Sequence, residues 1–533
     1  MKVLGSNPRG GSKMKHIPSH PYLHVSRASD LAGWDRTLYR FLECLPAVLS
    51  IGTLTGLSAL AFFAPTAAAY FTILFSGYWL FKTIFLSAHL HHNFKRLRHN
   101  MQVNWQERLQ NFKYDDVVHV VIFPFYKEPY EVLRASVRAV VESKYDGKKI
   151  AVVLAAEARA GLDARSMAER IQSEFRGVLL DCIVTVHPSD TPGDMAGKGS
   201  NIAYAAEEAR ERILDARNLP YARTLVSAFD VDTIVYPHYF SCLTWHFQTA
   251  ERPSRVSFQP VPLYNNNIWE APVLSRVLAY SSTYWQMIQQ ERPERLSTFS
   301  SHAVPMDALV EAGYWQRNMV SEDSRIFWNL FVRFDGDYSV IPLSYPVSMD
   351  ANVAGTTWGT VKNLYKQHRR WSYGAENIPY MIFNFIKNPR IPLRKKLFNI
   401  STQLEGFWSL VTHPIILFAV GWFPLIVGGH AFNDTVLSYN LPIVAQWFLT
   451  LAMFGLVTCS AYFMFLIPQR PGVYTWRQSI LMALQWALVP LTMVAFSSLP
   501  GLEAQVRLAT GRYLGFWVTP KERVLKSRKT QSA

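Results

Sequence analysis

The chain has 533 residues, of which 49% are hydrophobic and 17% are charged, and its formal net charge at pH 7 is +15. A chain of this length exceeds one compact core, so we expect more than one structural unit. The apolar fraction is too high for an ordinary soluble enzyme, and the charged fraction is too high for a pure membrane bundle. The composition therefore predicts membrane segments combined with a sizeable aqueous domain.

The four cysteines are scattered along the chain and have no paired spacing: Cys44, Cys182, Cys242 and Cys459. This excludes a zinc site or a disulfide framework and suits a reducing, cytosolic face. The basic residues gather in clusters that border or follow apolar segments, at 2–40, 95–98, 390–396 and 521–529. Cytoplasmic flanks that face anionic lipid have this pattern. No zinc-finger spacing or basic heptad region occurs, so we expect no nucleic-acid binding.

Residues 1–42 are polar and basic, and we expect a poorly ordered cytosolic segment there. Leu45–Ala64 and Ala67–Leu90 each have about the ~20 apolar residues that cross a bilayer, with a proline-containing turn between them. They predict a transmembrane hairpin over residues 43–91. The basic cluster that follows places both ends of the hairpin on the cytoplasmic side.

From residue 114 to residue 386, strand and helix patterns alternate. Five apolar runs predict strands: Val117–Phe123, Ile150–Leu154, Val178–Val186, Thr224–Phe229 and Arg255–Gln259. Four segments predict helices: Pro129–Glu142, Ala164–Glu174, Ser200–Leu214 and Pro237–Thr249. This order predicts an α/β domain with a mostly parallel sheet and helices on both faces. Ligands of such sheets bind at the carboxyl ends of the strands.

Residues 387–499 predict an interfacial helix followed by membrane segments. Three apolar stretches are long enough to enter a bilayer: 404–429, 441–467 and 478–499. The loop 430–440 has no Lys or Arg and is expected outside, whereas 469–477 carries two Arg and is expected in the cytoplasm.

The last of these stretches raises a problem of orientation. A full crossing by 478–499 would place the basic tail, residues 500–533, outside, against the positive-inside rule. We therefore expect a bent or re-entrant segment that is broken near Pro490, with the tail in the cytoplasm.

The run Thr224–Phe229 ends in Asp230 and Asp232, with one residue between them. Alternate side chains of an extended chain point the same way, so both carboxylates project from one edge of the sheet. Two interpretations are open. The pair is a turn or helix-start signal, or it holds a divalent cation against a phosphate.

Other polar residues follow the predicted strands in the same way. Tyr126 can stack on a flat base, with Glu128 nearby to accept hydrogen bonds, although an ordinary loop aromatic would look the same. Glu157 ends the second strand at the same edge. The segment 197–201 opens a helix with Lys198 and backbone N–H groups that suit a phosphate, or it is simply capped by Ser200.

Two further segments carry candidate chemistry. Glu322 and Asp323 lie in the first turn of an amphipathic helix, where acids are ordinary capping residues, or Asp323 is a general base. Near Gln367, the planar guanidinium of Arg370 can bind a leaving diphosphate through two hydrogen bonds, and the ring of Trp371 can pack against a sugar ring. Arg and Trp are also typical of a helix at the membrane interface.

Taken together, these motifs resemble the signature of membrane-integrated family 2 glycosyltransferases, such as cellulose synthase and hyaluronan synthase. The matching motifs, in chain order, are Pro124-x-Tyr-x-Glu128, Lys198-x-x-Asn201, Asp230-x-Asp232, Ser321-Glu-Asp323, Gln367-His-Arg-Arg-Trp371 and Phe516-Trp-Val-Thr-Pro-Lys521. The resemblance covers residues 114–386 closely and the membrane parts more loosely. It implies a GT-A-type domain inserted between α-helical transmembrane segments.

The resemblance also implies roles for individual residues and a single in-line displacement with inversion. Asp323, beside Glu322, would be the catalytic base, and Asp232 with Asp230 would hold Mg²⁺ or Mn²⁺. Donor and nucleotide contacts would come from Tyr126, Glu128, Glu157, Lys198, Asp230, Thr519 and Lys521. The acceptor and diphosphate site would be formed by Gln367, Arg370 and Trp371.

The sequence departs from the family pattern at several positions. The second strand ends in Ala155-Ala-Glu157, where the family usually has Asp. The Cys-Gly pair of cellulose synthases is replaced around Ser300-Ser-His302, and we expect His302 to be a satisfied loop histidine. The gating-like segment 516–521 follows the last apolar run instead of lying between membrane helices.

The expected activity is elongation, with extrusion, of a polysaccharide from a nucleotide-sugar donor, most simply a UDP-sugar. The expected location is the plasma (inner) membrane, with several crossings, a cytoplasmic catalytic domain, a glycan or lipid acceptor, contact with membrane lipid and room for accessory export subunits. Transfer of one sugar to a lipid acceptor is the alternative enzyme. A non-catalytic transporter or scaffold is the alternative from another class, although the apolar runs contain almost no acidic residues.

Overall fold

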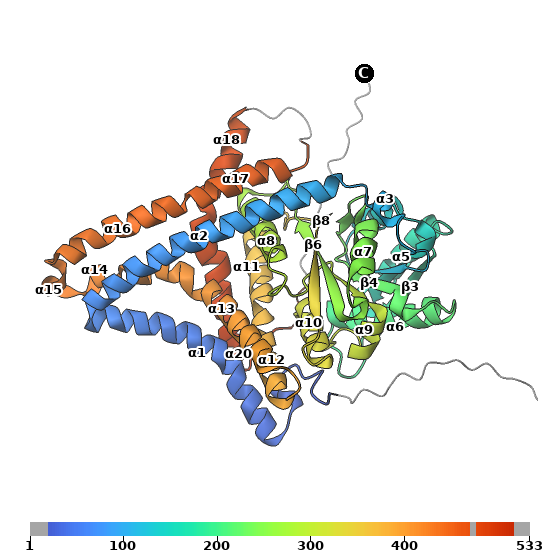
Figure 1. Cartoon of the computed structure of the whole chain (residues 1–533), viewed down its shortest axis with the longest axis horizontal. Coiled ribbons are helices and arrows are strands. Elements are labelled where there is room, and N and C mark those ends of the chain that lie inside the picture. The colour runs from blue at the N-terminus through green and yellow to red at the C-terminus, as the bar shows by residue number, and fades with distance from the viewer. Residues whose placement is uncertain (1–19, 470–475, 516, 518–533) are drawn as a thin grey trace, which may run out of the picture.

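The computed structural model describes residues 20–469, 476–515 and 517. A sheet with its covering helices lies at one end of the molecule, and long apolar helices splay out at the other (Figure 1). The long helix α2 (Pro65–Gln102) runs from the far end of the apolar helices to the sheet domain. It therefore joins the two parts directly.

The sheet has eight strands in the order β3-β2-β1-β4-β7-β6-β8-β5. Their bounds are β1 Val118–Phe125, β2 Ile150–Glu157, β3 Asp181–His187, β4 Thr224–Ala228, β5 Ile234–Val235, β6 Val256–Leu263, β7 Ala303–Pro305 and β8 Ser339–Ser348. The first four strands of this order pair in parallel, as do β6 and β8, whereas β7 and β5 pair antiparallel with their neighbours. The predicted mostly parallel sheet is confirmed.

Helices cover both faces of the sheet, because the strand side chains alternate between two apolar cores. Val120 and Ile122 of β1 face the core that contains α6, α9, α10 and α12. Val121 and Phe123 face the core that contains α4, α5 and α7. The helices of this part are α3 Trp105–Leu109, α4 Tyr130–Val141, α5 Leu162–Glu174, α6 Lys198–Ala209, α7 Tyr239–Thr249, α8 Val273–Gln290, α9 Met306–Ala312, α10 Glu322–Arg333, α11 Thr357–Ser372 and α12 Asn377–Lys387.

All five predicted strands and all four predicted helices of the domain are present, with boundaries shifted by a few residues. The sequence did not predict β5, β7 or β8. Strand β8 carries Pro342 and Pro346, and prolines inside a run argue against a central strand. The structure accommodates both because the pairing of β6 with β8 is irregular between Gln259 and Val261, opposite these prolines.

The expectation of poor order across the whole N-terminal segment is wrong for residues 20–42; residues 1–19 lie outside the described part. Helix α1 (Gly33–Phe63) begins well before the expected hairpin. The segment before it packs on the sheet domain because its apolar side chains, including Leu23 and Val25, join the core beside α10 and α12. Its carbonyl groups are also bound: Arg325 Nη1 donates to Val25 O (3.1 Å) and Tyr380 Oη to Leu23 O (2.9 Å).

Arg325 should be a large contributor to stability, since its side chain is fully buried. Its guanidinium also donates to Asn377 Oδ1 (2.6 Å) and Glu376 O (3.2 Å). Replacing it by Ala leaves several buried acceptors without donors, at a cost of about 3 kcal/mol or more. We expect a lower apparent melting temperature for Arg325→Ala and faster protease cleavage within residues 20–32. Arg252→Ala, which removes an exposed partner of Asp337, serves as the control and should change neither.

Four helices of the described chain are long and apolar enough to cross a membrane: Gly33–Phe63, Pro65–Gln102, Val436–Leu466 and Ile480–Ala509. A fifth would be Leu393–Phe418 together with Val420–Val427, which are bent by 40°. The remaining elements of this part are α13 Leu393–Phe418, α14 Phe423–Val427, α15 Gly429–Asn433, α16 Val436–Ala452, α17 Phe454–Leu466, α18 Trp476–Leu484, α19 Val489–Thr492 and α20 Leu499–Ala509.

The expected break near Pro490 is a local change of helical pitch, and the chain stays helical to Ala509 rather than ending at residue 499. A 3₁₀ turn at Gln485–Leu488 precedes Pro490, which then lies at the start of a helical segment. Proline is tolerated there because the first N–H groups of a helix have no partner within it. The first residues of the predicted tail therefore belong to a long apolar helix.

Candidate active site

The candidate residues gather where the parallel strands β1, β2 and β4 end. Tyr126 follows β1, Glu157 is the last residue of β2, and Asp230 and Asp232 follow β4. Helices α6 and α10 begin nearby, and each brings a candidate residue in its first turn. Because parallel strands share the direction of their carboxyl ends, residues far apart in sequence meet at one edge.

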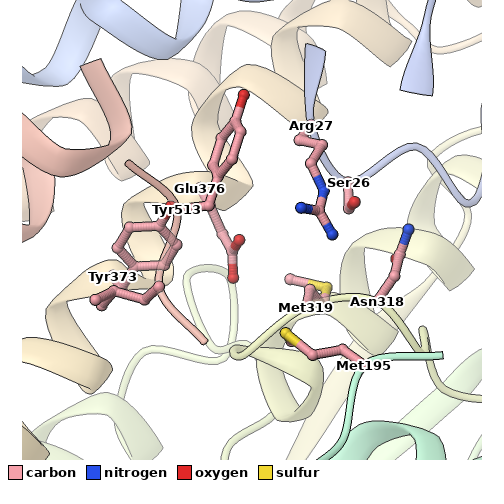
Figure 2. A pocket seen from close by; sticks show the side chains of 9 residues that line it. Ser26, Arg27, Met195, Asn318, Met319, Tyr373, Glu376 and Tyr513 are labelled. Carbon is pink, nitrogen blue, oxygen red and sulfur yellow. The ribbon is translucent and has the colours of Figure 1, made fainter. Parts of the chain in front are cut away.

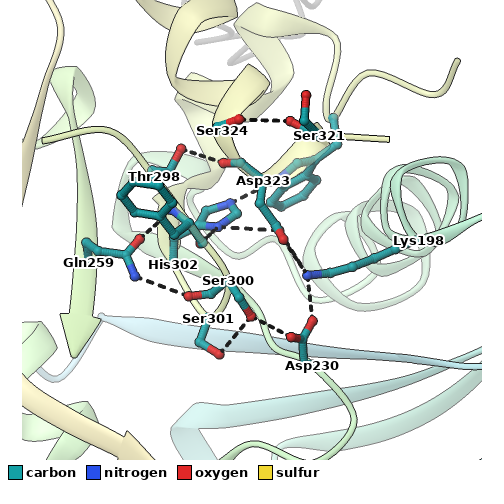
Figure 3. A network of polar contacts seen from close by, with 12 residues as sticks. Lys198, Asp230, Gln259, Thr298, Ser300, Ser301, His302, Ser321, Asp323 and Ser324 are labelled. Carbon is teal, nitrogen blue, oxygen red and sulfur yellow. Dashed lines mark hydrogen bonds and ion pairs between the residues drawn. The ribbon is translucent and has the colours of Figure 1, made fainter. Parts of the chain in front are cut away.

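Lys198 joins carboxylates from two of these segments (Figure 3). Its Nζ donates to Asp230 Oδ1 (2.7 Å) and to Asp323 Oδ1 and Oδ2 (2.9 and 2.8 Å). The side chain is only 9% exposed. Burial by itself lowers the pKa of this amine, but Asp230 and Asp323 outweigh burial and raise the pKa far above its ordinary value. The lysine is therefore a fixed cation among acids.

The loop before β7 supports the same acids. Ser300 Oγ donates to Asp230 Oδ2 (2.7 Å), and Thr298 Oγ1 donates to the backbone oxygen of Asp323 (2.6 Å). The sequence showed this loop only as a departure from the family pattern and gave neither residue a role. A short hydroxyl-rich loop carries no spacing signal, so only the structure could identify them.

Asp232 lies deeper than Asp230 and is fully buried. Its Oδ2 accepts a hydrogen bond from the backbone N–H of Asp350 (2.9 Å). Asn266 Nδ2 donates to both Asp232 O and Asp350 Oδ1, each at 2.9 Å. Sequence reasoning missed Asn266 and Asp350, although both follow strands, β6 and β8. Asp350 was missed because β8 was not predicted, and Asn266 was missed because the predicted strand ended at Gln259 whereas β6 runs on to Leu263.

The carboxylates at this edge of the sheet fit a divalent cation that is bound partly by the protein and partly by a substrate phosphate. Among the described residues, no three His, Cys, Asp or Glu side chains lie close enough to form a complete protein cage. Mg²⁺ is commonly held by one or two carboxylates together with substrate phosphates and water. Asp232 and Asp230 are the carboxylates that could hold such a cation. Both oxygens of Asp230 already accept hydrogen bonds, so cation binding through Asp230 requires an exchange of partners.

Glu322 lies behind Asp323 and is 1% exposed, and neither of its carboxylate oxygens has a hydrogen-bond partner within the described chain. Burial, together with the charge of Asp323, raises its pKa to about 8. Gly199 makes this close packing of α6 on α10 possible, because an added Cβ would lie 2.7 Å from Gln316 O and 3.1 Å from Glu322 Cβ.

The pKa of Glu322 predicts a pH-dependent stability. The unfolded carboxyl ionises near its ordinary value, whereas the folded one holds its proton to about pH 8, so this group costs stability as the pH rises between those values. Glu322→Gln removes the cost. We expect its apparent melting temperature to exceed the parent's by about 2–5 °C at pH 8.5 and to match it at pH 5. An equal difference at both pH values would contradict the elevated pKa.

An aromatic and charged cluster lies at the ends of β1 and β2. The Arg159 guanidinium lies 4.9 Å from the centroid of the Tyr126 ring and pairs with Glu157. Glu128 Oε2 accepts a hydrogen bond from the Tyr126 backbone N–H (2.6 Å). The structure thus brings the predicted Tyr126, Glu128 and Glu157 together, and it adds Arg159 as a residue that the sequence did not single out.

The last turns of α11 carry Gln367, Arg370 and Trp371. Gln367 Oε1 accepts from Asn352 Nδ2 (3.2 Å), and Trp371 is 39% exposed with its ring centroid 6.5 Å from that of Tyr264. Burial and the charges of Asp230 and Asp232 raise the pKa of Tyr264, while Arg370 and Lys198 oppose them. Arg370 is therefore close enough to interact electrostatically with the carboxylate cluster, which consists of Asp230, Asp232 and Asp323.

Two predicted donor residues, Thr519 and Lys521, lie outside the described residues. Within the same segment Trp517 is described, and Lys366 Nζ of α11 lies 5.2 Å from the centroid of its ring. This contact brings the start of the gating-like segment next to the helix that carries Arg370.

His302 is neutral and satisfied, as expected from the sequence. It is fully buried, its Nδ1 donates to Phe299 O (2.7 Å), and its Nε2 accepts from Trp315 Nε1 (3.0 Å). Burial lowers its pKa below the ordinary value. Its Nδ1 also lies 3.8 Å from Asp323 Oδ1, beyond hydrogen-bond distance, so the hydrogen bonds of both ring nitrogens remain within the surrounding loops.

A separate pocket of about 440 Å³ opens beside Arg27, Asp194, Asn318 and Tyr513. It adjoins a smaller one, which Figure 2 shows and which extends toward Tyr373 and Glu376. None of the predicted site residues lines either pocket. The carboxylate cluster, rather than these pockets, therefore marks the candidate site.

No protein-family model matches the sequence, and no curated protein matches it either. Solved structures similar to the chain include the mannosyltransferase PcManGT from Pyrobaculum calidifontis in complex with GDP-Man and Mn²⁺. This match has 13% identity and a TM-score of 0.40, and it covers 79% of this chain and 98% of that one. Residues 1–349 of S. aureus TarS match at 10% identity and a TM-score of 0.35, covering 67% and 94%.

GalNAc-T7 with UDP, GalNAc and Mn²⁺ matches at 11% identity and a TM-score of 0.33, covering 56% of this chain and 59% of that one. At these TM-scores the neighbours carry no weight for function.

Proposed function

We propose that the chain is an inverting, metal-dependent glycosyltransferase of the family 2 type, which elongates a polysaccharide from a nucleotide-sugar donor. One observation carries the proposal. Lys198, at the start of α6, bonds to Asp230 after β4 and to Asp323 in α10, so acids from distant segments share one site. Asp232 lies at the same edge of the sheet. A decayed domain in a transporter or scaffold would not be expected to retain this assembly.

In this proposal the strand ends bind the donor. Tyr126 offers its ring face to the base, and Glu128 and Glu157 accept hydrogen bonds from the base or ribose. Lys198 and the N-terminus of α6 attract the diphosphate. Mg²⁺ or Mn²⁺ would be held by Asp232 and Asp230, and when bound it neutralises charge on the phosphate oxygens.

The chemical step needs a base for the acceptor hydroxyl and stabilisation of the leaving diphosphate. Asp323, at the opening of α10, is the base in this proposal. The hydroxyl oxygen attacks the anomeric carbon as the bond to the diphosphate breaks, and its proton passes to Asp323. Arg370 stabilises the negative charge of the leaving group. A single displacement inverts the anomeric configuration.

The acceptor is proposed to lie next to the apolar helices, because the helix that carries Gln367 and Trp371 packs on α20. Tyr365 Oη and Arg369 Nη1 of α11 donate to Glu503 (3.0 and 2.6 Å). The acceptor side of the site thus adjoins a helix long and apolar enough to cross a membrane. In this proposal the growing glycan leaves through the apolar helices. The basic clusters beside the apolar segments lead us to propose that the catalytic domain lies in the cytoplasm and the protein in the plasma (inner) membrane.

The test uses the full chain in native membranes. Membranes with and without the protein are incubated with UDP- and GDP-sugars plus Mg²⁺ or Mn²⁺, and release of nucleoside diphosphate and product length are recorded. The proposal expects one donor, most simply a UDP-sugar, to give long products only when the metal is present. Products with one added sugar would instead support transfer to a lipid acceptor. Release that is independent of the protein for every donor would refute a glycosyltransferase.

A further inference from the structure

The ammonium group of Lys198 is held by two carboxylates. An ammonium group has three N–H donors, and Lys198 Nζ contacts three carboxylate oxygens. One belongs to Asp230 (2.7 Å) and the other two are both side-chain oxygens of Asp323 (2.9 and 2.8 Å). The two oxygens of Asp323 share the ammonium, so a diphosphate that takes two of its N–H groups must displace Asp230 or Asp323.

The same contacts restrain Asp323. Both oxygens of the Asp323 carboxylate accept from the one ammonium group, so an acceptor hydroxyl that bonds to this carboxylate must share or displace the Lys198 contact. The restraint is electrostatic rather than steric, because the Asp323 side chain is 23% exposed and within reach of an incoming hydroxyl. Both oxygens of Asp323 become available to an acceptor hydroxyl only when the ammonium moves away.

Movement of the ammonium requires a competitor with more charge than a carboxylate. A diphosphate is such a competitor, and the N-terminus of α6, where Lys198 lies, attracts anions through its backbone N–H groups and helix dipole. Asp230, the second partner, is also a proposed cation ligand. Loss of Lys198 from Asp230 would free the oxygen atom that the cation needs.

We propose that Lys198 is a donor-sensing latch that holds Asp323 until the diphosphate of the nucleotide sugar takes its ammonium group. This inference rests on the proposed function and adds an order of events, in which the donor binds before the acceptor hydroxyl is activated. The acceptor hydroxyl is activated only in molecules that already hold a donor. Lys198 thus acts as a positioning residue for Asp323 as well as a phosphate contact.

The latch makes a prediction about nucleotide binding that a phosphate contact alone does not. If Asp323 competes with phosphate for Lys198, Asp323→Asn should tighten the binding of UDP even though Asp323 is assigned no contact with the nucleotide. We expect the Kd for UDP to fall by about threefold or more, measured by calorimetry on the solubilised full chain in EDTA. In a Lys198→Gln background the same substitution should leave the Kd unchanged.

The four-variant comparison separates the latch from a general effect of charge. If Asp323→Asn lowers the Kd for UDP equally in the parent and in the Lys198→Gln background, Asp323 acts only through its negative charge. If it lowers the Kd in neither background, Asp323 does not compete with phosphate for Lys198. Either result overturns the latch. Asp350→Asn is a second control, and it needs no Lys198 variant. The Oδ1 of Asp350 accepts a hydrogen bond from Asn266. This substitution removes a neighbouring acid, and tightening equal to that of Asp323→Asn would also overturn the latch.

The two proposals fail in different ways. If the parent binds neither UDP nor GDP in the presence of Mn²⁺, the proposed function itself fails. If the parent binds one of them but Lys198 and Asp323 show no coupling, only the latch fails. Melting temperatures of all variants, compared with Asp337→Asn at an exposed ion pair, show whether each is folded before its Kd is interpreted.

Discussion

Asp323→Asn is expected to lower glycosyl transfer by about 10²- to 10⁴-fold, the range that a positioned general base contributes. The side chain keeps its size, and the Thr298 hydroxyl still bonds to the backbone oxygen at this position. The variant should therefore fold and bind nucleotide but fail to take the proton of the acceptor hydroxyl. The measurement is the initial rate of nucleoside diphosphate release with the donor that the panel identifies, at saturating metal.

The control for this variant is His302→Gln, next to Asp323 in space but engaged in loop contacts through both ring nitrogens. It tests whether disturbing the surrounding loop is enough to reduce the rate. We expect a loss of less than about tenfold, together with a lower melting temperature. Transfer at the parental rate in Asp323→Asn would remove the base from the proposed mechanism.

Asp232→Asn is expected to abolish the dependence of nucleotide binding on the divalent cation and to lower transfer by at least about 100-fold. Asn retains a side-chain oxygen that can accept the Asp350 N–H, so the backbone contact at the end of β8 is preserved. What is lost is one negative charge at a fully buried position. A neutral amide binds Mg²⁺ or Mn²⁺ more weakly than a carboxylate does.

The measurement is the Kd for UDP with and without Mn²⁺, in the parent and in the variant. The parent should bind UDP more tightly with Mn²⁺, whereas the variant should give the same Kd in both conditions. Ser300→Ala is the matched control, since it removes a hydrogen bond to Asp230 but leaves both carboxylates in place. A parental response to Mn²⁺ in Asp232→Asn would exclude Asp232 as a cation ligand.

Residues that follow predicted strands were the most accessible part of the site. Asp230 and Asp232 could be predicted because an apolar run ends at them and alternate side chains of an extended chain point the same way. Lys198 and Asp323 could be predicted because each opens a helix. These are local signals, and they depend on a few neighbouring residues.

Other residues of the site could not be found in this way. Asp350 follows β8, whose prolines concealed the strand, and the irregular pairing with β6 that accommodates them is not encoded within β8 itself. Ser300 lies in a loop without periodicity. The packing of residues 20–32 depends on Arg325 and Tyr380, which are 300 and 357 residues away from their partners in sequence, so local composition predicted disorder instead.

By itself, the sequence determined most strands and helices of the domain to within a few residues, which stretches are apolar enough for a bilayer, and that Asp230 and Asp232 follow a strand, because these follow from periodicity over a few residues. Only the tertiary structure decided that Lys198 bonds to Asp230 and Asp323 at once, and that Glu322 is buried with its proton. Both depend on how α6 and α10 pack at the sheet edge. Burial and ion pairing are properties of that packing, since they are set by atoms that the chain brings together only when it folds.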